Sequence, residues 1–167
     1  MFDELRPDMV CRDVMSIDLD ALERLGVRAL MFDLDNTLAR WNRYDVAPGL
    51  RAWLDGCRAR GFAVCICSNN RAARVRPVAE TLGIKFIADA GKPAHEAYGR
   101  ACALLGAPAG QVAAVGDQLL TDVFGAKRNG MRAVLVNPIG GREFAGTYVN
   151  RALERPVMRL MGVRRAR

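Results

Sequence analysis

The sequence predicts an α/β fold in which a parallel sheet of about five strands is covered by helices on both faces. Two observations support this prediction. Short apolar runs alternate with amphipathic stretches along the chain, and a glycine follows each amphipathic stretch. At 167 residues, the chain fits a single domain spanning residues 1–167 around one hydrophobic core.

Strands and helices are expected in strict alternation. Runs of bulky apolar side chains mark the strands, which we expect at Arg28–Leu34, Phe62–Cys67, Lys85–Ala88, Val112–Val115 and Arg132–Val136. Amphipathic stretches mark the helices, which we expect at Leu19–Leu25, Pro48–Arg60, Arg71–Leu82, Pro93–Leu105 and Leu119–Asn129. A glycine suited to a left-handed C-terminal cap follows each helix, at Gly26, Gly61, Gly83, Gly106 and Gly130. Pro48 and Pro93 are expected to open their helices, because the first helical position tolerates a missing N–H.

The first predicted strand ends in two carboxylates, Asp33 and Asp35. Strand side chains repeat every two residues, so both carboxylates point to the same side if the strand continues through Asp35. In open α/β sheets, ligands bind at this carboxyl edge. Two adjacent negative charges repel each other unless a cation or a shared proton offsets the repulsion. The pair therefore predicts a divalent metal or acid/base chemistry.

Polar residues also follow the next three strands, and a parallel sheet brings them to the same edge. Ser68-Asn69-Asn70 follows the second strand, Lys92 follows the third, and Gly116-Asp117 with Asp122 follows the fourth. Mg²⁺ prefers oxygen ligands, while a lysine and backbone N–H groups can neutralise a phosphoryl group. The combination predicts a site for phosphate and magnesium.

These strand-end motifs, in this order, resemble the four motifs of the haloacid dehalogenase-like (HAD) superfamily. Asp33-Leu34-Asp35-Asn36-Thr37 resembles the first motif, Ser68 the second, Lys92 the third, and Gly116-Asp117 with Asp122 the fourth. The resemblance implies a three-layer Rossmann-like HAD fold with Mg²⁺ as cofactor. Phosphatases of the superfamily have an aspartate at the position of Asp35, whereas its dehalogenases and ATPases do not. The resemblance therefore implies a phosphatase.

The resemblance also implies the catalytic roles. Asp33 is expected to be the nucleophile that forms an aspartyl-phosphate, and Asp35 the acid/base that protonates the leaving alcohol and then activates water. Ser68 is expected to bind a phosphoryl oxygen, and Lys92 to offset charge on the nucleophile and the phosphate.

The binding residues follow from the same resemblance. Backbone N–H groups of Leu34, Asp35 and Asn69 are expected to assist in binding the phosphate. Magnesium is expected on Asp33, the carbonyl oxygen of Asp35, and Asp117. Asp122 is expected to bind the metal directly or through water.

The spacing of the motifs leaves no room for a cap domain, so we expect the uncapped arrangement called C0. Only a short flap (about Leu38–Ala47), one helix and one strand separate Asp35 from Ser68, and only one helix and one strand separate Ser68 from Lys92. An uncapped site is open to solvent, which favours a phosphate on a macromolecule or a lipid.

The flap and the helix after Ser68 contribute candidate substrate contacts. Trp41 either contacts the substrate or packs the flap onto the body of the protein. Arg71, Arg74 and Arg76 lie in the first turns of the predicted helix, where they either help bind an anion or lie in solvent. His95, the only histidine, is expected at the surface.

The formal net charge of +7 is concentrated near the C-terminus, where residues 142–167 hold seven arginines and two glutamates. We expect a basic amphipathic segment over about residues 147–167, although Pro156 interrupts it. Its apolar stripe comprises Val149, Leu153, Val157, Leu160 and Met161. Either this segment packs on the sheet with its arginines in water, or it contacts an anionic bilayer at about 1 kcal/mol per arginine.

Composition also bears on location. The five cysteines show no zinc spacing and are expected to be reduced core thiols in a cytosolic protein. The N-terminus lacks the pattern of a signal peptide, and no apolar stretch approaches the length of a membrane span. We expect a cytoplasmic protein, or one peripheral on the inner face of the membrane. The sequence gives no indication of oligomeric state.

Over nearly its whole length, the chain resembles the YqeG-type branch of HAD subclass IIIA. The matching positions include Trp41, Ala90–Pro93, Gly116–Val123, Thr147, Asn150-Arg151 and Glu154. Eukaryotic members of this branch are phosphatidylglycerophosphate phosphatases, so the resemblance implies a phospholipid substrate. The alternative is a phosphatase of a soluble metabolite, nucleotide or phosphoprotein. A phosphoacceptor signalling domain also uses an aspartate, a metal and a lysine, but it puts the acceptor after a middle strand and lacks the motif Gly116-Asp117 with Asp122. A non-catalytic RNA- or membrane-binding protein would leave the four motifs unexplained, so nucleic acid is not an expected partner.

Overall fold

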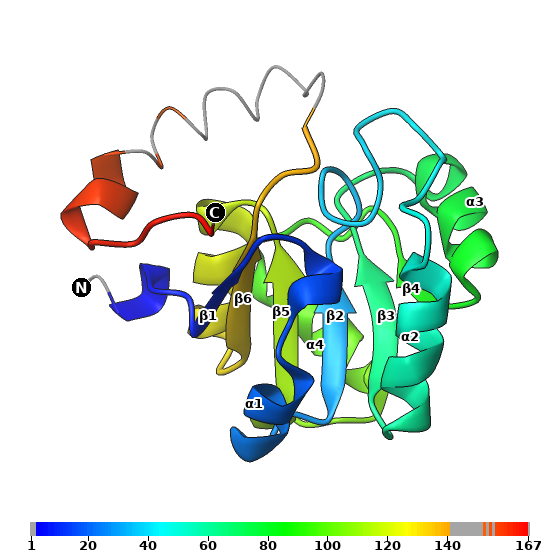
Figure 1. The fold of residues 1–167 in the computed structure, drawn as a ribbon, viewed down its shortest axis with the longest axis horizontal. Helices are drawn as coiled ribbons and strands as arrows, with labels where there is room; N and C mark the ends of the chain where they lie inside the picture. The colour runs from blue at the N-terminus through cyan, green and yellow to red at the C-terminus, as the bar shows by residue number, and fades with distance from the viewer. Residues whose placement is uncertain (1–2, 141–151, 153, 155, 167) are drawn as a thin grey trace.

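The computed structural model describes residues 3–140, 152, 154 and 156–166, and Figure 1 shows their arrangement. Its centre is a sheet of parallel strands in the order β1-β6-β5-β2-β3-β4. The strands are β1 (Met9–Cys11), β2 (Ala29–Phe32), β3 (Ala63–Cys67), β4 (Lys85–Ile87), β5 (Val112–Gly116) and β6 (Arg132–Val136). The predicted α/β fold is confirmed, with one strand more than expected.

The α-helices lie close to their predicted positions. They are α1 (Leu19–Arg24), α2 (Leu50–Ala59), α3 (Ala72–Leu82), α4 (His95–Leu105) and α5 (Phe124–Arg128). The shorter helical turns are η1 (Asp3–Leu5), η2 (Val14–Ser16), η3 (Ala109–Gln111) and the π-helical η4 (Leu119–Val123). The five glycines predicted to follow the helices all have positive φ.

Three details of the predicted elements are wrong. Pro48 and Pro93 precede their helices instead of opening them, because Gly49 and Ala94 are the N-caps of α2 and α4. The helix expected over Leu119–Asn129 is divided into η4 and α5. The first predicted strand ends at Phe32, so Asp33 and Asp35 lie in the loop that follows it.

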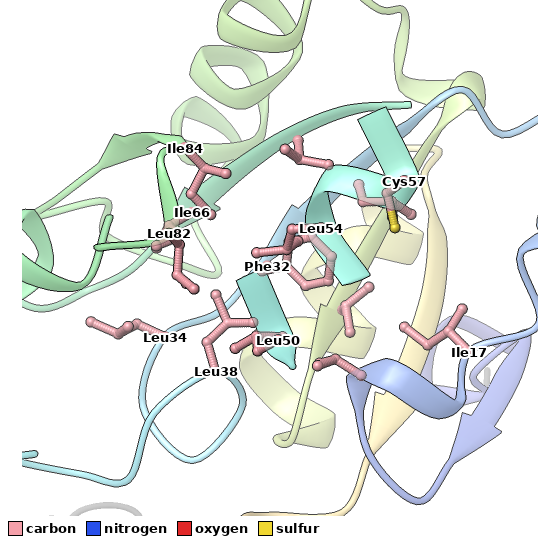
Figure 2. Packing of buried hydrophobic residues seen from close by; sticks show 14 of the residues in the cluster. Ile17, Phe32, Leu34, Leu38, Leu50, Leu54, Cys57, Ile66, Leu82 and Ile84 are labelled. Carbon is pink, nitrogen blue, oxygen red and sulfur yellow. The ribbon is translucent and has the colours of Figure 1, made fainter. Parts of the chain in front are cut away.

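Alternate residues of the buried strands face opposite layers of helices. Leu30 and Phe32 of β2 pack in one core cluster with side chains from α1, α2 and α3, and Figure 2 shows the part of this cluster around Phe32 and Leu54. Ala29 and Met31 face the second cluster, which α4, η4 and α5 complete. This period-two alternation produces the three layers of the fold.

The strand order places β2 and β5 side by side at the centre of the sheet. The chain runs from β2 outward through β3 to β4, and then returns to the other side of β2 for β5. A parallel sheet has its ligand-binding crevice at the carboxyl ends of the strands where this reversal occurs. The loops after β2, β3, β4 and β5 are those that carry the predicted site residues.

No cap domain interrupts the described part of the chain. The segment between β2 and β3 contains the flap and α2, and the segment between β3 and β4 contains α3. Within the flap, Ala39 forms isolated bridges with Asp35 and Val46. Within the described residues, the short flap is the segment between β2 and β3 that contributes to the cleft at the strand ends.

The described part of the C-terminal segment packs on the second cluster. Residues 156–160 are helical, Met158 is buried, and Val157, Met161 and Val163 pack beside it. The predicted apolar stripe is partly wrong, because Leu160 is 73% exposed and Met158 takes the buried position. Val149, Leu153, Thr147, Asn150-Arg151 and Arg155 lie outside the described residues.

The structure bears on two further expectations. All five cysteines are free thiols; four are buried and Cys102 is half-buried. Across residues 3–140 and the described part of the C-terminal segment, no helix is both long enough and apolar enough to cross a membrane.

Candidate active site

A cleft of about 720 Å³ lies at the carboxyl edge of the sheet. It is lined by seven of the ten predicted site residues: Asp33, Asp35, Trp41, Ser68, Asn69, Arg71 and Lys92. Of the other three, Leu34 has its side chain fully buried in the first core cluster, while Asp117 and Asp122 lie in the loop and turn that follow β5. The cleft has the volume of a pocket that holds a drug-sized ligand.

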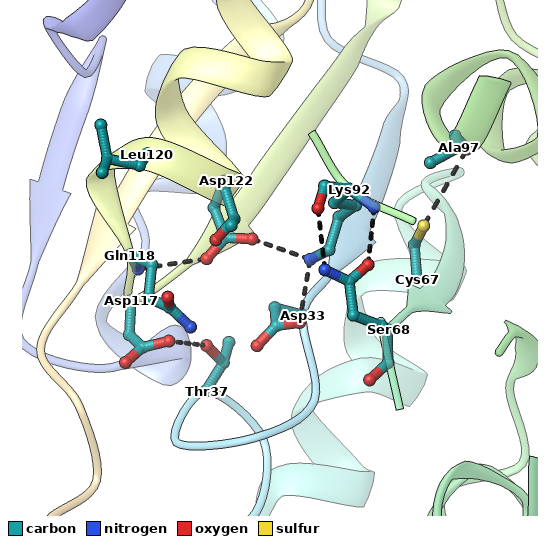
Figure 3. Close-up of polar contacts among 12 residues, drawn as sticks. Asp33, Thr37, Cys67, Ser68, Lys92, Ala97, Asp117, Gln118, Leu120 and Asp122 are labelled. Carbon is teal, nitrogen blue, oxygen red and sulfur yellow. Dashed lines mark hydrogen bonds and ion pairs between the residues drawn. The ribbon is translucent and has the colours of Figure 1, made fainter. Parts of the chain in front are cut away.

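Lys92 joins the loops after β2 and β5. Its ammonium donates to Asp33 Oδ1 at 2.9 Å and to Asp122 Oδ1 at 2.8 Å (Figure 3). Burial alone would lower the pKa of Lys92, but the carboxylates of Asp122 and Asp33 outweigh it and raise this pKa well above its ordinary value. Lys92 is therefore a fixed positive charge.

Asp33, Asp117 and Asp122 form a cluster with the chemistry of a metal site. One carboxylate oxygen from each lies within 4.8 Å of the others, and all three residues are buried. Burial raises the pKa of Asp33 to about 7, although Lys92 lowers it, and Asp122 adds to the rise. A divalent cation with a preference for oxygen ligands fits three buried carboxylates gathered in this way. The Asp35 side chain is not part of the cluster, so its expected metal contact remains the carbonyl oxygen.

The position of Asp122 depends on a glycine. A Cβ on Gly116 would lie 2.5 Å from Asp122 Cβ and closer still to the carboxylate, so no larger residue fits there. The Gln118 N–H also donates to Asp122 Oδ2 at 3.1 Å. Beside it, Thr37 Oγ1 lies 3.5 Å from Asp117 Oδ1. Gly116 thus leaves room for the Asp122 carboxylate, and the residue after it supplies the Asp117 carboxylate.

Asp35 occupies a different environment from Asp33. It accepts hydrogen bonds from Arg74 Nη2 at 2.7 Å and from Asn70 Nδ2 at 2.9 Å. Arg74 is only 7% exposed, also donates to the Arg40 carbonyl oxygen, and lies under the Tyr44 ring. The solvated alternative is therefore wrong for Arg74.

The contacts of Asn70 and Arg74 with Asp35 were not predicted from the sequence. Asn70 and Arg74 lie 35 and 39 residues from Asp35, so no local spacing indicates these contacts. The available signal was the position of Arg74 one turn beyond Arg71, on the helix that follows Ser68.

The Asn69 side chain binds the main chain of Lys92. Asn69 Nδ2 donates to the Lys92 carbonyl oxygen at 2.8 Å, and the Lys92 N–H donates to Asn69 Oδ1 at 2.6 Å. Any contact of Asn69 with phosphate is therefore left to its backbone N–H. Ser68 is buried beside it, and its Oγ accepts from the Asn70 N–H at 3.1 Å.

Trp41 and Arg71 both line the cleft. Trp41 is half-buried, and its backbone N–H donates to Asn36 Oδ1 at 3.3 Å. Arg71 is exposed and is the N-cap of α3. His95, at the start of α4, is exposed as expected.

The fold and this arrangement of motifs define a hydrolase of the HAD type. A family model for haloacid dehalogenase-like hydrolases matches residues 15–130, and the chain belongs to this family.

The chain is also similar to individual phosphatases. It is 37% identical over 152 residues to the probable phosphatase YqeG of Bacillus subtilis (strain 168), a match that covers 91% of this chain and 88% of YqeG. It is 31% identical over 159 residues to the chloroplastic phosphatidylglycerophosphate phosphatase 1 of Chlamydomonas reinhardtii, covering 89% of this chain and 59% of that protein. The chain thus spans less than two thirds of the algal enzyme. These similarities confirm the predicted enzyme class, a phosphatase of this family.

Solved structures share the fold. A HAD phosphatase from Thermococcus onnurineus aligns with a TM-score of 0.56 at 20% identity, covering 71% of this chain and 90% of that one. An uncharacterized protein from Corynebacterium glutamicum aligns with a TM-score of 0.54 at 21% identity, covering 85% of this chain and all of that one.

Proposed function

We propose that this protein hydrolyses a phosphomonoester through an aspartyl-phosphate on Asp33, with Mg²⁺ as cofactor. The observation that carries the proposal is the different surroundings of two carboxylates that line one cleft. Asp33 contacts Lys92 and belongs to the acidic cluster with Asp117 and Asp122. Asp35 instead contacts Arg74 and Asn70. Asp33, held by Lys92, fits the attacking carboxylate, and Asp35, which lies outside the cluster in the same cleft, is left to move protons.

The proposed reaction has two steps. In the first, a carboxylate oxygen of Asp33 forms a bond to phosphorus, the ester P–O bond breaks, and Asp35 gives its proton to the leaving alcohol. In the second, Asp35 takes a proton from water, whose oxygen attacks phosphorus and releases inorganic phosphate and the Asp33 carboxylate. Lys92 and Ser68 would bind the phosphoryl oxygens, assisted by the N–H groups of Leu34, Asp35 and Asn69.

The carboxylates of Asp33, Asp117 and Asp122, with the carbonyl oxygen of Asp35, would hold the magnesium ion. The bound ion would supply positive charge against the phosphoryl oxygens.

The best candidate substrate is phosphatidylglycerophosphate, which would give phosphatidylglycerol. The name of the algal relative supports this proposal, and so does the uncapped cleft, which admits a bulky ester. This lipid carries a phosphodiester near its phosphomonoester, and the exposed Arg71 lines the cleft beside the catalytic residues. An arginine at this position fits a substrate with a second phosphate. Such a substrate would place the enzyme at a membrane surface during turnover.

The test compares phosphate release from phosphatidylglycerophosphate in micelles with release from a panel of soluble phosphomonoesters, with and without Mg²⁺. We expect Mg²⁺-dependent release that is fastest with the lipid, and no release by the Asp33→Asn variant. Faster turnover of the soluble esters would refute the lipid substrate. Activity retained in Asp33→Asn would refute the nucleophile.

A further inference from the structure

The end of the chain returns to the loop that carries the acidic cluster. In Figure 1, the red segment of described residues near the end of the chain approaches the turn that follows β5, where Arg165 contacts Asp117. The described residues 154 and 156–166, here called the C-terminal brace, contact this region at two points. One contact is made by Glu154 and the other by Arg165.

Glu154 holds the start of η4. Its side chain is buried, and its Oε1 accepts from the N–H groups of Leu119 at 2.7 Å and Leu120 at 3.2 Å. The first N–H groups of a helical turn have no partner within the turn, and a carboxylate gives them charge-assisted hydrogen bonds. The turn fixed in this way carries Asp122.

Arg165 holds the other side of the same loop. Its Nη2 donates to the carbonyl oxygen of Asp117 at 2.8 Å, and its Nη1 donates to the carbonyl oxygen of Val136 at 2.7 Å. Asn137 Nδ2 also donates to the Ala166 carbonyl oxygen at 2.8 Å. One guanidinium therefore ties the residue after β5 to the end of β6.

Both contacts act on the backbone from which the candidate metal ligands extend. Arg165 binds the carbonyl oxygen of Asp117 itself, and Asp122 comes two residues after Leu120, whose N–H donates to Glu154. The third carboxylate, that of Asp33, comes from a different loop. The carboxylate oxygens of the three residues therefore lie close together only when the loop after β5 is correctly placed. Groups that orient metal ligands without touching the metal affect its affinity strongly.

We propose that Glu154 and Arg165 are positioning residues that set the metal affinity of this phosphatase. The inference rests on the proposed function, because it takes Asp33, Asp117 and Asp122 as the metal ligands. It also gives one arginine of the basic C-terminal segment a role within the fold instead of at a membrane.

The test is calorimetric titration of the full chain with Mg²⁺ in the absence of substrate. We expect Glu154→Ala and Arg165→Ala each to weaken Mg²⁺ binding by about 10- to 100-fold. Glu154→Gln retains an acceptor oxygen for Leu119 and Leu120, so a smaller loss is expected. Arg164→Ala is the matched control, since Arg164 carries the same charge one residue away and is exposed. It should bind Mg²⁺ like the wild type.

A role limited to stability would lower the unfolding temperature without changing the Mg²⁺ affinity of the folded protein. That result for Arg165→Ala would overturn the proposal, as would an equal loss of affinity in Arg164→Ala. If Glu154→Ala does not fold, Arg165→Ala decides the matter. Wild-type protein that binds Mg²⁺ but releases phosphate from no ester would refute the proposed function and leave the affinity comparison intact.

Discussion

Replacing Gly116 by alanine tests whether the position of Asp122 matters for catalysis. The added Cβ would lie 2.5 Å from Asp122 Cβ, whereas carbon atoms in contact are separated by about 3.5–4.0 Å. Asp122 must therefore move by about 1 Å, which would disturb its hydrogen bond to Lys92 and its place beside Asp33 and Asp117. A displacement of about 1 Å in an active site can cost about 100-fold in rate. We expect a loss of this order in kcat/KM.

The assay is the initial rate of phosphate release at several Mg²⁺ concentrations, together with thermal unfolding. Gly99→Ala is the matched control, because Gly99 lies in α4 with nothing within 4 Å of the added Cβ. This control should keep full activity and gain roughly 0.5–1 kcal/mol in stability, since alanine is the better helix former. A folded Gly116→Ala variant with wild-type kcat/KM and Mg²⁺ dependence would refute the reasoning.

Three further predictions concern charge, metal and thiols. Arg74→Met removes a buried partner of Asp35, so we expect the free energy of unfolding to fall by about 1–3 kcal/mol and kcat to decrease. Arg76 is exposed, so Arg76→Met should change neither quantity. An unchanged kcat in Arg74→Met would contradict the role of the ion pair. Saturating Mg²⁺ at about 100 times its Kd should raise the unfolding temperature by roughly 5–10 °C in calorimetry, and EDTA should reverse the rise; no shift would argue against a metal site. Burial raises the pKa of Cys67 to about 11, so this thiol stays protonated at neutral pH. We expect Cys67 to be alkylated more slowly than the half-buried Cys102, as measured by mass spectrometry. Equal alkylation rates would contradict this prediction.

The sequence was sufficient to predict the central strands and the residues at their ends. Uninterrupted apolar runs mark a parallel sheet, and such a sheet brings its strand ends together whatever the helices between them do. Asp33, Ser68 and Lys92 were therefore predicted to share one edge, and all three line the cleft.

What the sequence left unpredicted depends on contacts between distant residues. β1 has only three residues, Met9–Cys11, and its place at the edge of the sheet depends on pairing with β6. The contacts of Arg74 with Asp35 and of Glu154 with Leu119 join residues 39 and 35 positions apart. No local periodicity encodes them, because each depends on where the tertiary fold places its two partners.

The pairing of β1 also bears on how the protein folds. Met9 pairs with Val134, so among the described strands the first one along the chain pairs only with the last, β6. Contacts between residues so far apart in the chain slow the search for the native state. During synthesis on the ribosome, β1 therefore cannot pair with the sheet until β6 has emerged. We expect shortened chains that end before β6 to expose the flank of β5 and to aggregate.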